Sequence, residues 1–94
     1  MEIEQVITLV RDEIEKAIEK FPTWPTDPLH ALAVLGEEYG ELNKAMLQFV
    51  YEPCKTEKHE IEKEAIQTAA MALRLIMSLD RYDYMESDQH RQQE

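Results

Sequence analysis

The sequence predicts an all-α fold in which a helical hairpin follows one further helix. Residues that favour helices dominate the 94-residue chain together with charged residues, and it contains only two glycines and four prolines. Apolar side chains recur at three- and four-residue steps in three segments, which proline-containing connections separate. A chain of this length suits one small domain. We therefore expect a single helical domain over residues 1–85 and a flexible, polar tail over residues 86–94.

The first expected helix covers roughly residues 2–21. Its apolar positions follow the spacing of an amphipathic helix, and its opposite face is charged and solvated. Pro22 ends the helix, because a proline pushes the residue before it out of helical geometry. We interpret this helix as a packing element. Its apolar residues are Ile3, Val6, Ile7, Val10, Ile14, Ala17, Ile18 and Phe21.

The second expected helix begins after Asp27 and ends at Val50 or Tyr51. The carboxylate of Asp27 can cap free backbone amides, and Pro28 is tolerated in the first turn of a helix. A proline-rich connection precedes this helix and contains the only tryptophan of the chain, Trp24. Two interpretations of Trp24 remain open, a lid over the core or a surface on which a base stacks.

The third expected helix covers about residues 57–81. It follows a loop in which Pro53 breaks the second helix and Thr56 is the expected cap of the third. Because this loop is short, the second and third helices should pack antiparallel.

Both helices of the expected hairpin carry carboxylates within their apolar stripes. At about 100° per residue, Glu38 falls inside the stripe of the second helix and Glu41 lies at its edge. On the third helix, Glu64 leads into the apolar stripe and Gln67 lies about 60° from its direction. A buried ionised carboxylate is costly unless a positive charge meets it. If the two faces oppose each other, three carboxylates and one amide converge, a set of oxygen ligands that suits Mg²⁺ or Mn²⁺ rather than zinc.

Composition limits the classes of partner. Ten basic residues against twenty acidic ones give a net charge of −10, which makes a surface for duplex nucleic acid improbable. No apolar run reaches the roughly 18 residues that a membrane span needs, and the N-terminus is acidic rather than signal-like. A lone cysteine, Cys54, fits a reducing cytoplasm. An anionic substrate stays possible if a bound cation supplies the attraction.

The carboxylate pattern resembles that of the MazG-like, all-α nucleoside triphosphate pyrophosphohydrolases. The signature of that family is Glu-Glu-x-x-Glu on one helix and Glu-x-x-Asp on the next. Residues 37–41 read Glu-Glu-Tyr-Gly-Glu and match the first half, whereas residues 64–67 read Glu-Ala-Ile-Gln. The resemblance covers roughly residues 26–80, and it departs from the family at Gln67, where members carry an aspartate.

The resemblance implies hydrolysis of a nucleoside triphosphate to the monophosphate and pyrophosphate, with Mg²⁺, or alternatively Mn²⁺, as cofactor. Glu37 or Glu41 would orient or deprotonate the attacking water. The implied metal ligands are Glu38, Glu41, Glu64, Gln67 and, as a substitute for the charge absent at Gln67, Glu60.

Basic and aromatic residues are candidates for binding the substrate. The phosphate-binding candidates are Lys44, Lys63 and Arg74, and the base-stacking candidates are Phe21, Trp24 and Tyr39. Members of the family assemble as dimers or tetramers, so the resemblance implies a homodimer or homotetramer that forms a multi-helix bundle. The wide apolar arc of the second helix independently indicates burial on more than one side.

Two alternatives to the enzyme remain. One is a catalytically weak or silent protein of the same fold that binds a nucleotide or metal, which would follow from the uncharged Gln67. The other is a purely structural helical interaction module, in which the glutamates are solvated or paired with lysines.

Overall fold

The computed structural model describes residues 1–52 and 54–84. This part of the chain forms three α-helices, α1 (Ile3–Lys20), α2 (Pro28–Tyr51) and α3 (Lys58–Met77), followed by the short 3₁₀ helix η1 (Leu79–Arg81), and it contains no strand. The prediction of an all-α fold is confirmed. Pro53 and the expected tail over residues 86–94 lie outside the described residues.

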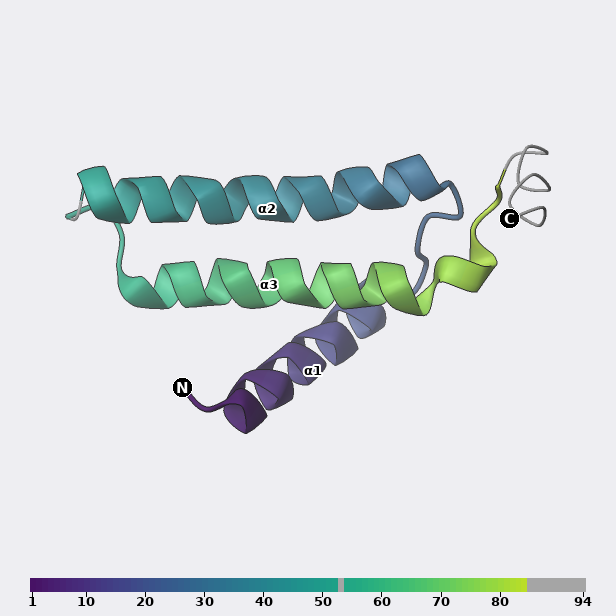
Figure 1. Ribbon diagram of the computed structural model, residues 1–94, viewed down its shortest axis with the longest axis horizontal. Helices are drawn as coiled ribbons and strands as arrows, with labels where there is room; N and C mark the ends of the chain where they lie inside the picture. Colours follow the sequence, from purple (N-terminus) through teal and green to yellow (C-terminus); the bar gives the residue numbers. More distant parts are fainter. Residues whose placement is uncertain (53, 85–94) are drawn as a thin grey trace, which may run out of the picture.

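α3 is the central helix of the fold. α2 and α3 lie side by side and run in opposite directions, as the short loop predicts, and α1 crosses α3 obliquely on its other side (Figure 1). α1 and α2 each pack on α3 rather than on each other. Within the described residues, none of the helices combines the length and apolar character that crossing a bilayer requires.

The start of α2 follows the local capping prediction. The carboxylate of Asp27 accepts hydrogen bonds from the backbone N–H groups of Leu29, at 2.8 Å, and His30, at 3.4 Å. Pro28 is the first helical residue, where its missing N–H costs nothing. α2 ends at Tyr51, within the predicted range.

The two ends of α3 differ from the prediction. Glu57 rather than Thr56 occupies the N-cap position, so the prediction of a Thr56 cap is wrong. α3 ends at Met77 instead of continuing as one helix to residue 81. The backbone N–H of Ser78 bonds to the carbonyl of Leu75, three residues earlier, and this tighter spacing leads into η1.

The interior of the described chain is shallow. Val10 of α1 packs against Ala70 and Met71 of α3, and Ala31 and Ala45 are buried on α2. The helices meet through small side chains, which lets their backbones approach closely. Partly buried apolar residues surround this core: Val6, Ile14, Ala17, Trp24, Val34, Leu35, Ile66 and Ala69.

Arg74 attaches the connection between α1 and α2 to the central helix. Its side chain is only 6% exposed, and its guanidinium donates a hydrogen bond of 2.6 Å to the backbone carbonyl of Phe21. The guanidinium carbon also lies 4.8 Å from the ring centroid of Trp24. The indole N–H of Trp24 donates to the hydroxyl of Tyr82 at 2.8 Å, and this hydroxyl lies 3.3 Å from the carbonyl of Leu75. We call these residues the Arg74 clamp.

Replacing the central residue of the clamp should destabilise the fold. Arg74→Met removes a charged donor and leaves the carbonyl of Phe21 without its partner, so we expect a loss of about 1.5–3 kcal/mol in the free energy of unfolding. Urea denaturation followed by circular dichroism measures it. Arg11→Met, which removes an exposed arginine of α1, is the matched control and should change stability by less than about 0.5 kcal/mol. Equal effects of the two substitutions would contradict a special role for Arg74.

Candidate functional site

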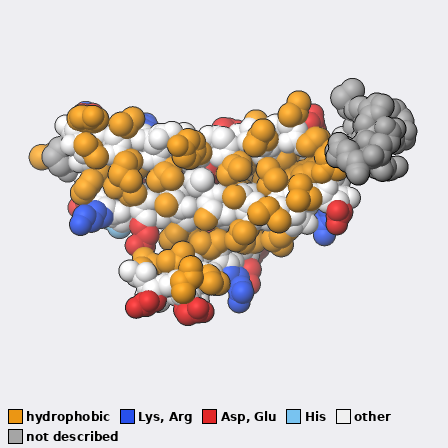
Figure 2. Space-filling view, viewed as in Figure 1, with side chains coloured by type: hydrophobic (Ala, Val, Ile, Leu, Met, Phe, Trp, Pro, Cys, Tyr) orange, Lys and Arg blue, Asp and Glu red, His pale blue; other side chains and the backbone are white. Residues whose placement is uncertain are grey.

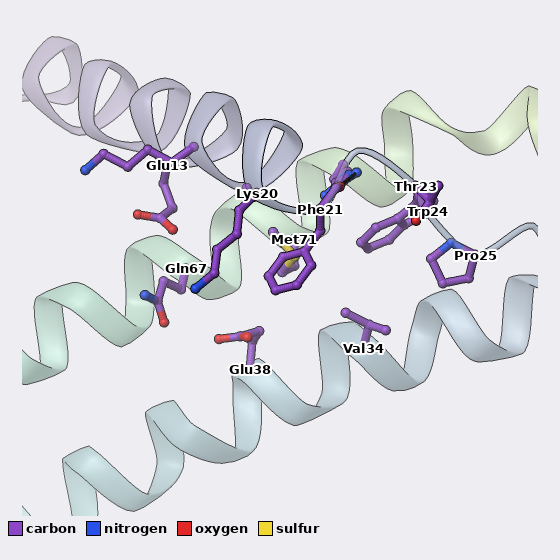
Figure 3. A pocket seen from close by; sticks show the side chains of 13 residues that line it. Glu13, Lys20, Phe21, Thr23, Trp24, Pro25, Val34, Glu38, Gln67 and Met71 are labelled. Carbon is purple, nitrogen blue, oxygen red and sulfur yellow. Dashed lines mark hydrogen bonds between the residues drawn. The ribbon is translucent and has the colours of Figure 1, made fainter.

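A cavity of about 620 Å³ lies between the three helices and the connection that follows α1. Its volume is within the range of about 300–1,000 Å³ that is usual for small-molecule sites. Figure 3 shows side chains from α1, α2 and α3 pointing into it from three directions. We call it the three-helix cavity. It is lined by Glu13, Lys16, Ala17, Lys20, Phe21, Thr23, Trp24, Pro25, Val34, Glu38, Gln67, Met71 and Arg74.

One end of the cavity is polar and acidic. Glu38 of α2, Gln67 of α3 and Glu13 of α1 all extend into this end (Figure 3). The predicted approach of Glu38 and Gln67 from facing helices is therefore present. Glu13 was not among the predicted site residues.

A threonine joins α2 to α3 at the level of the acidic side chains. The hydroxyl of Thr68 lies 2.7 Å from the carbonyl oxygen of Glu64 and 3.2 Å from that of Glu38. The two backbones that carry these glutamates are therefore close to the same hydroxyl. This contact sets the register of the hairpin at the site.

Glu38 is the carboxylate whose ionisation the fold most disfavours. Burial raises its pKa above the ordinary value of 4.5, and the negative charges of Glu64, Glu41, Glu37 and Glu13 raise it further, in that order. Four other carboxylates thus act electrostatically on Glu38. Three of them, at positions 37, 41 and 64, belong to the motif found in the sequence.

The carboxylates are neighbours without forming a closed coordination shell. Within residues 1–52 and 54–84, no three aspartate, glutamate, histidine or cysteine side chains converge closely enough to hold one ion as they stand. Glu37 and Glu41 are exposed, whereas Glu38 and Glu64 are half-buried.

Glu60 lies apart from this group. One of its carboxylate oxygens is 3.0 Å from Nε2 of His59 and the other is 3.9 Å from Nζ of Lys63. It neither lines the cavity nor contributes to the raised pKa of Glu38. The sequence placed Glu60 one turn from Glu64, and the structure turns its side chain to basic neighbours on its own helix.

The predicted substrate-binding residues divide into two groups. Trp24 and Arg74 line the cavity, as expected, and burial lowers the pKa of Arg74. Lys44 and Lys63 are exposed and do not line it. The cationic positions of the cavity that the sequence analysis missed are Lys16 and Lys20 of α1.

Two aromatic side chains line the cavity. Trp24 lies toward the end away from Glu13 and Gln67, and the ring of Phe21 lies between Trp24 and Lys20, close to Met71 (Figure 3). Tyr39, the third stacking candidate, is exposed and does not line the cavity. Because the guanidinium of Arg74 lies over one face of the Trp24 ring, a further planar group could stack only on the other face.

A local signal for the missed residues exists on the first helix. Glu13, Lys16 and Lys20 follow one another at three- and four-residue steps, so they share one edge of α1. This edge borders the apolar stripe that contains Val10 and Ala17. Lys16 and Lys20 are exposed, as the interpretation of this face as solvated predicts, and they line the cavity as well.

Comparisons of the chain with protein-family models, with curated proteins and with solved structures find no match. Its chemistry is therefore inferred from the cavity itself. The cavity has an acidic end, two lysines and two aromatic side chains.

The raised pKa of Glu38 makes a prediction about stability and pH. The ionised carboxylate of Glu38 is less favourable in the folded state than in the unfolded chain. Glu38 therefore contributes most to the free energy of unfolding at low pH, and this contribution is lost as the pH rises through its raised pKa. Glu38→Gln removes this loss of stability, because an amide does not ionise. Without divalent ions, the variant should be more stable than the native protein near pH 7, by on the order of 0.5–1 kcal/mol because the site is partly solvated.

Urea denaturation in EDTA at a series of pH values measures this difference. The difference in stability between Glu38→Gln and the native protein should disappear as the pH falls below 4.5, where Glu38 is protonated in both the folded and the unfolded state. Glu62→Gln removes an exposed glutamate from α3 and serves as the control, with little expected change. A stability gain for Glu38→Gln that persists unchanged at low pH would refute the electrostatic explanation.

Proposed function

We propose that the protein is a Mg²⁺-dependent nucleoside triphosphate pyrophosphohydrolase of the MazG-like all-α type, which releases a nucleoside monophosphate and pyrophosphate. The observation that carries this proposal is the position of Glu38. Its carboxylate extends into a cavity of ligand size, is partly desolvated, and lies within electrostatic reach of Glu37, Glu41 and Glu64. The order of these glutamates along two antiparallel helices supports the same family.

The donor atoms around Glu38 fit a hard divalent cation. Carboxylate and amide oxygens are the ligands that Mg²⁺ and Mn²⁺ accept, and the mutual repulsion of the glutamates favours a compensating positive charge. Glu38, Glu41 and Glu64 are the proposed ligands, with Gln67 as a neutral one. They would have to gather by changing side-chain rotamers, since they do not surround an ion as they stand. The Thr68 contact already holds the two backbones together.

In the proposed reaction each residue has a limited task. A bound Mg²⁺ would neutralise the triphosphate and polarise the α-phosphoryl group. Glu37 or Glu41, which are exposed beside Glu38, would orient or deprotonate the attacking water. Trp24 would stack on the base with the ring face that Arg74 does not cover.

Gln67 is the reason to keep a second candidate function. It lines the cavity beside Glu38, at the position where the resemblance expects an aspartate. An amide oxygen binds Mg²⁺ without adding charge, so the affinity for metal should fall. A silent member of the same fold would bind nucleotide and metal without turnover.

Pyrophosphate release from a panel of nucleoside and deoxynucleoside triphosphates tests the proposal. We expect turnover with Mg²⁺ or Mn²⁺, and a decrease of about 100-fold or more in Glu38→Gln and Glu64→Gln, because even the outer partners of metal ligands are worth 10–100-fold. Thermal shift should show a Mg²⁺-dependent rise in melting temperature that these variants lose. Gln67→Asp should increase the Mg²⁺-dependent rise in melting temperature.

Glu62→Gln is the control in both assays and should behave as the native protein does. Binding without turnover in the native protein, with turnover gained in Gln67→Asp, would favour the silent form. A thermal shift that Glu38→Gln retains in full would exclude a metal site at Glu38.

We also propose that the protein assembles as a homodimer or homotetramer through the outer face of α2. This face lies opposite the one that packs on α3 through Ala31 and Ala45. Figure 2 shows hydrophobic side chains along α2 on the surface of the molecule. A Cβ atom built on either glycine of this face would meet nothing within 4 Å, so a second helix has room to approach. The outer face of α2 includes Leu29, Leu32, Gly36, Gly40, Leu47 and Val50.

Sedimentation velocity tests the assembly. The native protein should sediment as a dimer or tetramer, and Leu47→Glu should shift it toward the monomer, because a charge in an apolar interface is costly. Ile3→Glu introduces the same charge at a similarly exposed apolar position on α1 and should leave the assembly intact. A monomeric native protein, or dissociation by Ile3→Glu alone, would contradict the α2 interface.

A further inference from the structure

We propose that α1 supplies the anion-binding side chains of the three-helix cavity, with Lys16 and Lys20 contacting the phosphate groups of a polyphosphate ligand. This inference deepens the proposed function and rests on it for the identity of the ligand. It assigns the phosphate contacts to a helix outside the carboxylate motif. It also transfers this role from Lys44 and Lys63, which face solvent away from the cavity.

The charge of the cavity wall supports an anionic ligand. The chain as a whole carries twenty acidic residues and ten basic ones. Three basic side chains, Lys16, Lys20 and Arg74, line the cavity with two carboxylates, Glu13 and Glu38, so basic residues are enriched in its wall relative to the whole chain. Basic side chains that line a concave surface attract anions, even on a protein of negative net charge.

The two lysines are available for binding. They are one helical turn apart on α1, so their side chains leave the helix on the same edge. Lys20 extends across the cavity toward Gln67 and Glu38 (Figure 3), and its ammonium lies 5.4 Å from the ring centroid of Phe21. In the described part of the chain, neither lysine forms an ion pair with a carboxylate, whereas Lys55 pairs with Glu52 at 2.9 Å.

Arg74 is less suited to this task than the lysines. Its guanidinium is committed to the carbonyl of Phe21 and to the ring of Trp24, and these contacts hold the connection after α1 in place. A phosphate that recruited Arg74 would compete with the fold. Lys20 would give up only its contact with the exposed ring of Phe21 on turning toward a ligand, which leaves the contacts of Arg74 intact, and flexible stems carry the ammonium groups of both lysines.

The remaining walls limit the shape of the ligand. Lys20 extends toward the acidic end, where a divalent cation is proposed, and the ring of Phe21 lies beside it, with Trp24 farther from the carboxylates (Figure 3). A chain of phosphates can meet the cation on one side and the ammonium groups on the other. A planar apolar group attached to that chain would reach the aromatic side chains. The arrangement therefore favours a polyphosphate that carries a base over a free phosphate ion.

Inorganic tripolyphosphate is the probe that isolates the anion-binding step, because it has no base. Isothermal titration calorimetry of the full chain in excess Mg²⁺ gives the affinity, and the fluorescence of Trp24, the only tryptophan, reports binding independently. Lys16→Gln/Lys20→Gln should weaken the affinity by about tenfold or more, because two charge-assisted contacts are lost. Lys44→Gln/Lys63→Gln changes the net charge equally and should change the affinity less than about twofold.

Two further results separate specific contacts from general attraction. Lys16→Arg/Lys20→Arg should retain most of the affinity, and the affinity of the native protein should fall as salt concentration rises. Equal losses in the two glutamine double variants would overturn the inference, because net charge would then explain both. Absence of tripolyphosphate binding to the native protein would overturn it as well.

The failure of this inference is distinguishable from that of the proposed function. Pyrophosphate release by the native protein, with an unchanged KM in Lys16→Gln/Lys20→Gln, would leave the hydrolase standing and refute the role of α1. Lysine-dependent binding of tripolyphosphate without hydrolysis of any triphosphate would support the role of α1 and refute the hydrolase.

Discussion

The structure depends on the contact of one buried guanidinium with a backbone carbonyl from a distant part of the chain. Arg74 lies near the end of α3, and Phe21 lies directly after α1. Their hydrogen bond, with the indole of Trp24 stacked against the same guanidinium, attaches the connection between α1 and α2 to the central helix. It also forms the aromatic part of the three-helix cavity. Stability and the shape of the site therefore depend on the same residues.

By contrast, the acidic end of the cavity holds a carboxylate, that of Glu38, whose negative charge the folded chain does not compensate. Glu38 is partly removed from water and is surrounded by other carboxylates, so the folded chain disfavours its ionised form. Proteins commonly place such groups where a ligand completes the electrostatics, because sites with shifted ionisation recur in functional clefts. The proposed divalent ion would supply that completion. The lysines of α1 would complement the ion by facing the anionic side of the substrate.

The parts of the fold that follow from local chemistry could be predicted from the sequence. The Asp27 cap, the end of α2 and the inward position of Glu38 follow from side-chain type and spacing alone. The parts that depend on tertiary contacts could not. The cavity position of Lys16 and Lys20 depends on how α1 crosses α3, which periodicity does not specify. Similarly, the partner of Arg74 is a backbone carbonyl, and backbone groups leave no mark in the sequence that identifies them as partners.

The shallow interior has a consequence for the behaviour of the protein in solution. Half of the buried apolar core in the described residues is alanine, and Val10, Met71 and Tyr82 are the larger members. A single chain of this kind gains little hydrophobic free energy from folding alone. If a second copy covers the outer face of α2, subunit association becomes part of the folding equilibrium through mass action. The melting temperature would then rise with protein concentration, and the number of copies in a cell would help determine what fraction of them is folded.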